Sequence, residues 1–356
     1  MLKGIVIMKT QEFKNKAQEA LLECLTEIPF LTVKERITQA PESEHPDILM
    51  RLKVDDQEQI LLIEMKNNGQ PRYARQAVNQ IFRYQDRYPE AYGIFIAPYI
   101  SPQSEAICRE ANVGFVDLAG NCHISFQTIY IHQTGKPNPY SQKRDLRSLY
   151  SPKAERILRV LLAYPSKAWK VEELANEADV SIGHVANIKK LLADHLWIED
   201  FSVGFSLKEP EALLEEWSEN YRFSRNKLSP FYTMDKLSDF EYRLGEICER
   251  EGVHYGLTGF SGAARLSPAV RYQRAMAYVN CDLDRLVDLL ELKSVTSGAN
   301  VALLTPYDEG VFFEENKIGG LRVLHPIQIY LDLKSMRGRG DEAAEVLLKE
   351  VIRKEW

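Results

Sequence analysis

Residues 46–84, PDILMRLKVDDQEQILLIEMKNNGQPRYARQAVNQIFRY, contain the clearest indication of how the N-terminal region folds. Two short apolar segments, 47–55 and 59–67, are typical of strands, and a helix is predicted to follow them. Asp47 begins the first segment, and Glu64 and Lys66 end the second. Because side chains alternate along a strand, Glu64 and Lys66 point to one face, and a neighbouring strand can bring Asp47 beside them.

This combination of side chains has a chemical meaning. Two carboxylates at the end of a sheet are hard oxygen ligands that suit Mg²⁺ or Mn²⁺. A lysine next to them can orient or deprotonate a metal-bound water, or stabilise charge on a phosphate. Gln76, Gln80 and Tyr84 are spaced by four residues, so a helix places them on one face. The group therefore predicts phosphodiester chemistry. The alternative is an ion pair of Lys66 with Asp47 or Glu64 that only stabilises the sheet.

The elements around this stretch predict an α/β layer around one mixed sheet. Apolar spacing predicts helices over 11–27, 73–87 and 102–111 and strands over 31–40, 47–55, 59–67, 91–98, 113–118 and 122–132. Pro46-Asp47 and Glu64-x-Lys66 in this element order resemble the PD-(D/E)xK restriction-endonuclease-like fold. Gln80-x-x-x-Tyr84 is similar to the helix motif of the RecB-like branch of that superfamily.

The resemblance implies roles for these side chains. It implies that Asp47 and Glu64 hold a metal ion and that Lys66 assists catalysis, with Gln80 and Tyr84 next to them. It also implies that a glutamate of the first helix sometimes completes the site, and the sequence does not choose between Glu19 and Glu23.

A polar segment follows this first predicted domain, residues 1–134. Residues 135–150 contain glycine and proline and predict a basic linker. Between 136 and 159 there are seven basic and two acidic residues, a pattern that can neutralise phosphates. Arg144 and Arg147 are candidate DNA contacts in this segment, although a solvated linker has the same composition.

Residues 151–210 predict a winged helix-turn-helix. Helices are predicted over 152–163, 169–175 and 182–194, and a hairpin over 197–207. Ser181 is placed to cap the third helix. The exposed face of that helix offers side chains that can reach base edges or phosphates: Ser181, His184, Asn187, Lys189 and Lys190. The segment has 8 basic and 9 acidic residues, however, so a protein-interaction module remains an alternative.

Residues 211–356 predict a second α/β domain, with helices near 211–220, 236–251, 283–293 and 341–354 and four short strands between them. A Gly-Ser loop around Ser261 precedes a helix and could hold phosphate, with arginines 265, 271 and 274 nearby. A nucleotidyltransferase-like site would use such a loop with an Asp-x-Asp pair. The gap to Asp282 is long for that pattern, and Asp282 is more simply the cap of the next helix.

The C-terminal motifs carry a second resemblance. Gly259-Phe260-Ser261-Gly262-Ala263, then PIQIYLDL at 326–333, then GRGDEAA at 338–344, resemble the type IV abortive-infection antitoxin regulators (AbiEi-like). The resemblance implies a DNA-binding repressor and a cognate toxin partner. The helix-turn-helix of this chain lies mid-chain, behind the nuclease-like domain, rather than at the N-terminus. That position leaves the antitoxin role open.

Composition excludes several classes of protein. The chain has 356 residues, is 45% hydrophobic and 27% charged, and has a net charge of −6, values typical of two or three folded domains. No apolar run is long enough to span a bilayer. Five cysteines without a CxxC pair predict a reduced, cytoplasmic protein without a cysteine zinc site.

We therefore expect a cytoplasmic DNA-binding regulator that binds double-stranded DNA. The alternatives are a nuclease that depends on Mg²⁺ or Mn²⁺ and a protein-interaction module. The oligomeric state is not predicted.

Overall fold

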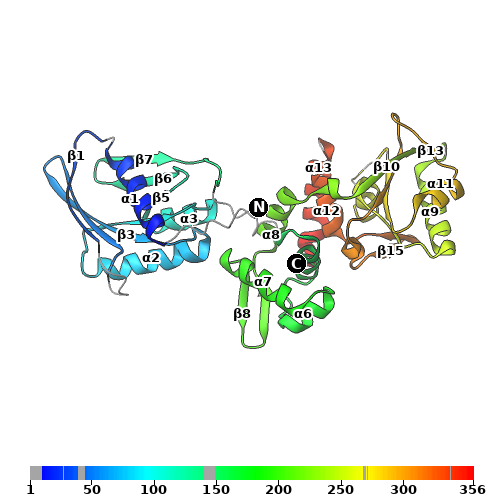
Figure 1. The fold of residues 1–356 in the computed structure, drawn as a ribbon. Coiled ribbons are helices and arrows are strands. Elements are labelled where there is room, and N and C mark those ends of the chain that lie inside the picture. The colour runs from blue at the N-terminus through cyan, green and yellow to red at the C-terminus, as the bar shows by residue number, and fades with distance from the viewer. Residues whose placement is uncertain are drawn as a thin grey trace, which may run out of the picture. The chain divides into compact units, whose positions relative to one another are not determined.

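The computed structural model describes residues 10–26, 28–38, 45–139, 149–267, 270, 272–336 and 338–356. The chain divides into two compact units, each with a mixed α/β architecture (Figure 1). One unit comprises Met1–Asp145 with Ala193–Leu196, and the other comprises Leu146–Leu192 with Trp197–Trp356. Most of the predicted linker, including Arg144 and Arg147, lies outside the described residues.

The N-terminal unit contains a seven-stranded sheet whose strands lie side by side in chain order. Neighbouring strands are antiparallel at both ends of the sheet and parallel in the middle, where β3, β4 and β5 pair. The elements are α1 (Thr10–Thr26), β1 (Leu31–Thr38), β2 (Ile48–Val54), β3 (Gln57–Met65), α2 (Pro71–Gln85), β4 (Tyr92–Ala97), α3 (Pro102–Glu110), β5 (Gly114–Asp117), β6 (Cys122–Phe126) and β7 (Ile129–Gln133). The predicted single mixed sheet is confirmed.

Helices cover both faces of this sheet. The buried face of α1, with Leu21 and Leu25, packs into one apolar cluster with side chains of β2, β3 and β4. The buried face of α2, with Ala77 and Ile81, packs into a second cluster on the other face. Gly93 makes this second contact possible, because a Cβ there would lie 2.2 Å from Cγ2 of Ile81. Helices α1 and α2 thus pack on opposite faces of the sheet and bury its central strands on both sides.

One predicted strand is wrong in its extent. The segment 122–132 was expected to be a single strand, but it forms the hairpin of β6 and β7. Gln127 at the turn has φ of +48°, a left-handed conformation that ends β6. The segment contains neither glycine nor proline, so the sequence carried no strong signal for this turn.

The second unit begins with three helices and a two-stranded hairpin. These are α5 (Pro152–Ala163), α6 (Val171–Glu177), α7 (Ile182–Asp194), β8 (Ile198–Phe201) and β9 (Gly204–Leu207). The backbone of Trp169, before α6, exchanges two hydrogen bonds with Phe205 of β9 and so forms an isolated antiparallel bridge to the hairpin. The predicted bounds of the first and third helices agree with those of α5 and α7.

A second mixed sheet of seven short strands follows, in the order β13-β10-β14-β12-β11-β16-β15. Its elements are α8 (Pro210–Asn220), η1 (Phe223–Arg225), β10 (Lys227–Tyr232), α9 (Leu237–Glu251), β11 (Tyr255–Leu257), α10 (Gly259–Leu266), β12 (Ala275–Val279), α11 (Leu283–Leu289), β13 (Lys293–Ser294), β14 (Val301–Thr305), η2 (Glu309–Phe312), β15 (Asn316–Ile318), β16 (Leu321–Val323), α12 (Pro326–Lys334), α13 (Arg339–Leu347), η3 (Leu348–Ile352) and α14 (Arg353–Glu355). Helix α12 is central to this region, since each of its residues from Pro326 to Leu333 is buried.

Candidate functional sites

The five side chains predicted for the N-terminal site lie together at the end of β3. We call Asp47, Glu64, Lys66, Gln80 and Tyr84, with Lys14, the carboxylate cluster. The Lys66 ammonium lies 2.6 Å from Oε1 of Glu64 and donates to Oε1 of Gln80 at 2.5 Å. The Tyr84 hydroxyl donates to the second oxygen of Glu64 at 3.3 Å. Strand alternation and the four-residue spacing on α2 thus bring these groups into contact.

Asp47 lies just before β2 and closes the cluster. Its Oδ2 accepts a hydrogen bond from the backbone N–H of Met65 at 2.8 Å, which ties the start of β2 to the end of β3. Its Oδ1 lies 3.6 Å from the ammonium of Lys14 on α1. Glu19 and Glu23 are both exposed, and the α1 side chain that lies beside Asp47 is Lys14. A role for either glutamate in the site stays a prediction.

Burial changes the acidity of two groups in this cluster. Burial raises the pKa of the Glu64 carboxyl, and the hydrogen bond from Lys66 opposes that rise. Burial and the nearby Glu64 carboxylate raise the pKa of the Tyr84 hydroxyl well above its usual value, so Tyr84 acts as a neutral donor. Within the described ranges, no three His, Cys, Asp or Glu side chains gather as metal ligands. As the side chains lie, the cluster fits a divalent cation poorly.

The second candidate site is the exposed face of α7. Ser181 accepts a hydrogen bond from the backbone N–H of His184 at 3.3 Å, as expected of a residue that caps the helix. Ser181, Asn187 and Lys190 are exposed. Lys189 is less available than predicted, because its ammonium lies 2.6 Å from Oδ1 of Asp200 on β8.

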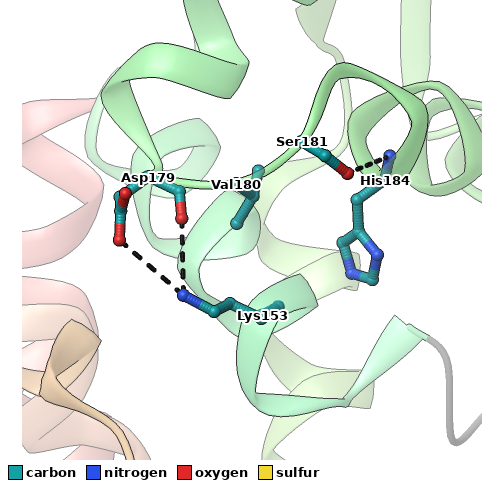
Figure 2. Close-up of a pocket in the computed structure, with 5 residues that line it drawn as sticks. All are labelled: Lys153, Asp179, Val180, Ser181 and His184. Atoms are coloured by element: carbon teal, nitrogen blue, oxygen red, sulfur yellow. Dashed lines mark hydrogen bonds and ion pairs between the residues drawn. The ribbon is translucent and has the colours of Figure 1, made fainter.

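A pocket of about 410 Å³ lies beneath the turn between α6 and α7 (Figure 2). Lys153, Asp179, Val180, Ser181 and His184 line it. Lys153 reaches both the carboxylate and the carbonyl oxygen of Asp179, at 3.7 and 3.5 Å. The imidazole Nε2 of His184 is buried and has no hydrogen-bond partner among the described residues. The first turn of α7 therefore presents polar side chains at a helix N-terminus.

Helix α5 connects this helical region to the C-terminal sheet. Arg156 donates from Nε to Asp308 at 2.7 Å and from Nη1 to Asp179 at 2.5 Å, so it bridges the loop before η2 and the turn before α7. One turn further along α5, Arg159 is buried and donates to Oε1 of Gln328 on α12. The α6–α7 turn is thereby linked to the C-terminal α/β region.

Gln328 and Asp332 of α12 organise a buried polar network. Oδ1 of Asp332 accepts hydrogen bonds from the hydroxyls of Tyr221 and Tyr278, both at 3.1 Å, and from the amide of Gln328 at 2.9 Å. Its Oδ2 accepts one from Thr258 at 2.5 Å. Burial raises the pKa of the Asp332 carboxyl to about 6 even with these donors. From the sequence alone, the PIQIYLDL motif had no role beyond the family resemblance. In the structure its Gln328 and Asp332 connect α12 to Tyr221, Thr258 and Tyr278 by buried hydrogen bonds.

The Gly-Ser stretch also has a structural role. The Ser261 hydroxyl is buried; it accepts a hydrogen bond from the backbone N–H of Met276 at 2.9 Å and donates to the carbonyl of Arg274. A Cβ on Gly262 would lie 2.8 Å from Cδ1 of Ile329, so this glycine permits close packing of α10 on α12. The expected phosphate loop is wrong for Ser261.

The other C-terminal candidates also have structural partners. Asp282 caps α11 by accepting from the backbone N–H of Asp284, which confirms that prediction. Arg265 donates to Glu241 at 2.5 Å, and Arg274 donates to the carbonyl of Ala299. Residue 271 lies outside the described residues.

Sequence reasoning missed Lys14, Arg156 and Arg159 as functional side chains. The sequence indicated a partly buried Lys14 only through its position next to Phe13, which belongs to the apolar face of the first helix. Arg156 and Arg159 were noted only as charge, although an arginine on the apolar face of a helix indicates a buried partner.

Part of the chain matches a known protein family. Residues 206–353 match the family model described as "Transcriptional regulator, AbiEi antitoxin, Type IV TA system". No curated protein and no solved structure matches the chain. In the parts of the chain that the structure describes, no helix combines the length and apolar character needed to cross a bilayer.

Proposed function

We propose that this chain is a DNA-binding transcriptional regulator of the type IV antitoxin kind, because its residues 206–353 match the AbiEi family model. We propose that α5, α6, α7 and the β8–β9 hairpin act as a winged helix-turn-helix with α7 as its recognition helix. The observation that carries this proposal is the exposed first turn and outer face of α7, where Ser181, Asn187 and Lys190 face solvent.

The chemistry of that face suits duplex DNA. Backbone N–H groups at a helix N-terminus bind phosphate oxygens well. Lysine can add a phosphate contact, and asparagine can pair with the edge of adenine in the major groove. Lys153 and His184, next to the first turn, offer further donors to a phosphate in the pocket of Figure 2.

Electrophoretic mobility shift across a salt series tests the proposal. We expect binding at low salt that weakens steeply as salt rises, because phosphate contacts release counterions. Lys190→Ala should weaken binding and reduce the salt slope by about 1. Lys349→Ala, which removes the same charge from an exposed position on η3, is the matched control and should bind as the wild type does. Absence of binding at low salt, or equal loss in both variants, contradicts the proposal.

A protein-interaction module is a second candidate, and one observation favours it. The β8–β9 hairpin has exposed acidic side chains at Glu199 and Asp200 and exposed apolar side chains at Phe201 and Val203. Acidic side chains repel DNA phosphates, whereas an exposed apolar tip suits contact with a protein. If the region is a protein-interaction module, a pull-down should capture a protein partner, such as a toxin encoded with this chain, and Phe201→Ser should abolish that capture. The mobility-shift assay should then show no DNA binding at low salt.

For the N-terminal unit we propose a PD-(D/E)xK restriction-endonuclease-like fold. Its support is the sheet with β3, β4 and β5 parallel and the assembly of Asp47, Glu64 and Lys66 at the end of β3. Cleavage that depends on Mg²⁺ or Mn²⁺ remains a prediction. Nicking of supercoiled DNA that is lost in both Asp47→Ala and Lys66→Ala would support it, whereas equal nicking by wild type and Lys66→Ala would exclude this site.

The family match also supports two coarser proposals about the setting of the chain. The description of the family is that of an antitoxin, so we propose a cognate toxin as a partner. A transcriptional regulator must reach chromosomal DNA, which lies in the cytoplasm of a bacterial cell. We therefore propose a cytoplasmic location. Fractionation of cells followed by immunoblotting tests the location.

A further inference from the structure

Every carboxylate oxygen of the carboxylate cluster has a partner from the protein itself. Oε1 of Glu64 contacts the Lys66 ammonium, and Oε2 accepts from Tyr84. Oδ2 of Asp47 accepts from the backbone of Met65, and Oδ1 faces the Lys14 ammonium. Two negative and two positive side chains therefore meet in one cluster, whose formal charge is zero.

Each of the two carboxylates has one oxygen that faces an ammonium group. A divalent metal ion bridging Asp47 and Glu64 would need oxygens of both carboxylates, at 2.0–2.1 Å for Mg²⁺. On Asp47 the oxygen not used by the backbone faces Lys14, and on Glu64 one oxygen faces Lys66. A metal ion must displace at least one ammonium group or share its carboxylate with a like charge.

Lys14 is fixed in this position by the packing of α1. Its neighbours Phe13 and Ala17 are buried, which sets the rotation of the helix against the sheet. The side chain of Lys14 is 21% exposed and that of Asp47 is 16% exposed, so water screens this pair less than an ion pair on the open surface. Lys16, two residues further along, lies 47% exposed and pairs with Glu12.

We infer that the Lys14 ammonium pairs with the Asp47 carboxylate and substitutes there for a divalent metal ion. The charges of the cluster are then balanced without a metal ion. Lys66 performs the same task for Glu64. The ion pairs of the cluster then stabilise the packing of β2, β3 and α2. Lys14 also weakens metal binding at Asp47, where the family resemblance implied a metal ligand. This inference concerns the N-terminal unit and does not depend on the proposed DNA binding.

Titration calorimetry with MnCl₂ on the full chain tests the inference. Wild type should bind Mn²⁺ weakly or without measurable heat. Lys14→Met should bind at least about tenfold more tightly, because an uncompensated Asp47 carboxylate then attracts the cation. Lys16→Met removes the same charge from the same helix and should behave as wild type does. Asp47→Asn in the Lys14→Met background should abolish the gain.

Three results would overturn the inference. They are Mn²⁺ affinity in Lys14→Met that is equal to or below that of wild type, an equal gain in Lys16→Met, and a gain that survives Asp47→Asn. Lys14→Arg keeps the charge and should bind Mn²⁺ as weakly as wild type does. If Lys14→Met does not fold, Lys14→Gln takes its place. Addition of Mn²⁺ should then raise the melting temperature of Lys14→Gln and leave that of wild type unchanged.

Discussion

Arg159 of α5 directs two guanidinium nitrogens at the side-chain oxygen of Gln328 on α12, and both residues are buried. The guanidinium also lies 5.1 Å from the ring centroid of Trp217 on α8. Three helices thus meet on one arginine. Since Gln328 in turn donates to Asp332, the first helix of the proposed winged helix-turn-helix is joined to the polar centre of the C-terminal region.

Replacement of this arginine should be costly for folding. Arg159→Met keeps much of the apolar stem but removes the charge, which leaves the buried Glu155 and the Gln328 oxygen with fewer partners. We expect the free energy of unfolding to fall by about 3–5 kcal/mol, measured by urea denaturation. Arg250→Met, at an exposed position, should change it by no more than about 0.5 kcal/mol. A loss below about 1 kcal/mol for Arg159→Met would contradict the structural role.

Asp332 should make stability depend on pH. Its folded pKa of about 6 lies above the ordinary value of 3.8, so between these two pH values the folded chain binds more protons than the unfolded chain. The free energy of unfolding therefore gains a contribution from Asp332 that falls as pH rises from about 4 to 6. Urea denaturation at several pH values should detect this fall. Asp332→Asn should be less stable overall and lack this component, and an unchanged slope in the variant would contradict the assignment.

The bridge through Arg156 should influence DNA affinity. Asp308→Asn removes a negative charge, which by itself strengthens binding to DNA slightly. It also weakens the hold on Arg156, which fixes Asp179 at the turn before α7. We expect the second effect to prevail, with DNA affinity reduced about threefold to tenfold in the mobility-shift assay. Asp288→Asn, on α11, has the same change in charge without this bridge and serves as the control. Stronger binding by Asp308→Asn would mean that Arg156 does not position α7.

Lys66 should contribute to stability whether or not the cluster has catalytic activity. Lys66→Met removes the ammonium partner of the buried Glu64 carboxylate and leaves it the hydrogen bond from the Tyr84 hydroxyl. We expect the free energy of unfolding to fall by about 1–3 kcal/mol at pH 7, with a smaller loss at pH 5, where more of the Glu64 carboxyl is protonated. Lys53→Met, at a more exposed ion pair on β2, is the control. An equal loss in both variants would contradict a special role for Lys66.

Local patterns predicted most of the elements. Apolar periodicity and capping residues gave α5 and α7 with their bounds, because these helices bury one regular face. Strand alternation and helical spacing also brought Glu64, Lys66, Gln80 and Tyr84 together correctly, since each contact joins neighbours on adjacent elements.

Contacts between distant segments were not predictable in the same way. Lys14 reaches Asp47 from α1, which packs on the opposite face of the sheet from α2, and no local pattern specifies such a contact. The burial of α12 on all sides removed the alternation of polar and apolar faces that marks a helix in sequence. The role of Ser261 depended on a hydrogen bond to β12, fifteen residues away.

The dependence of α5 on α12 has a consequence for how such a chain is assembled in evolution. The family match begins at residue 206, inside β9, yet α5 makes its buried contacts with a helix beyond that point. A cut at residue 206 would separate one hydrophobic and polar core into two incomplete halves. We therefore expect the unit that can be inherited or exchanged intact to start before α5. A recombination event that kept only the family-matching part would deliver a fragment in which the side-chain oxygen of Gln328 lacks its Arg159 donor.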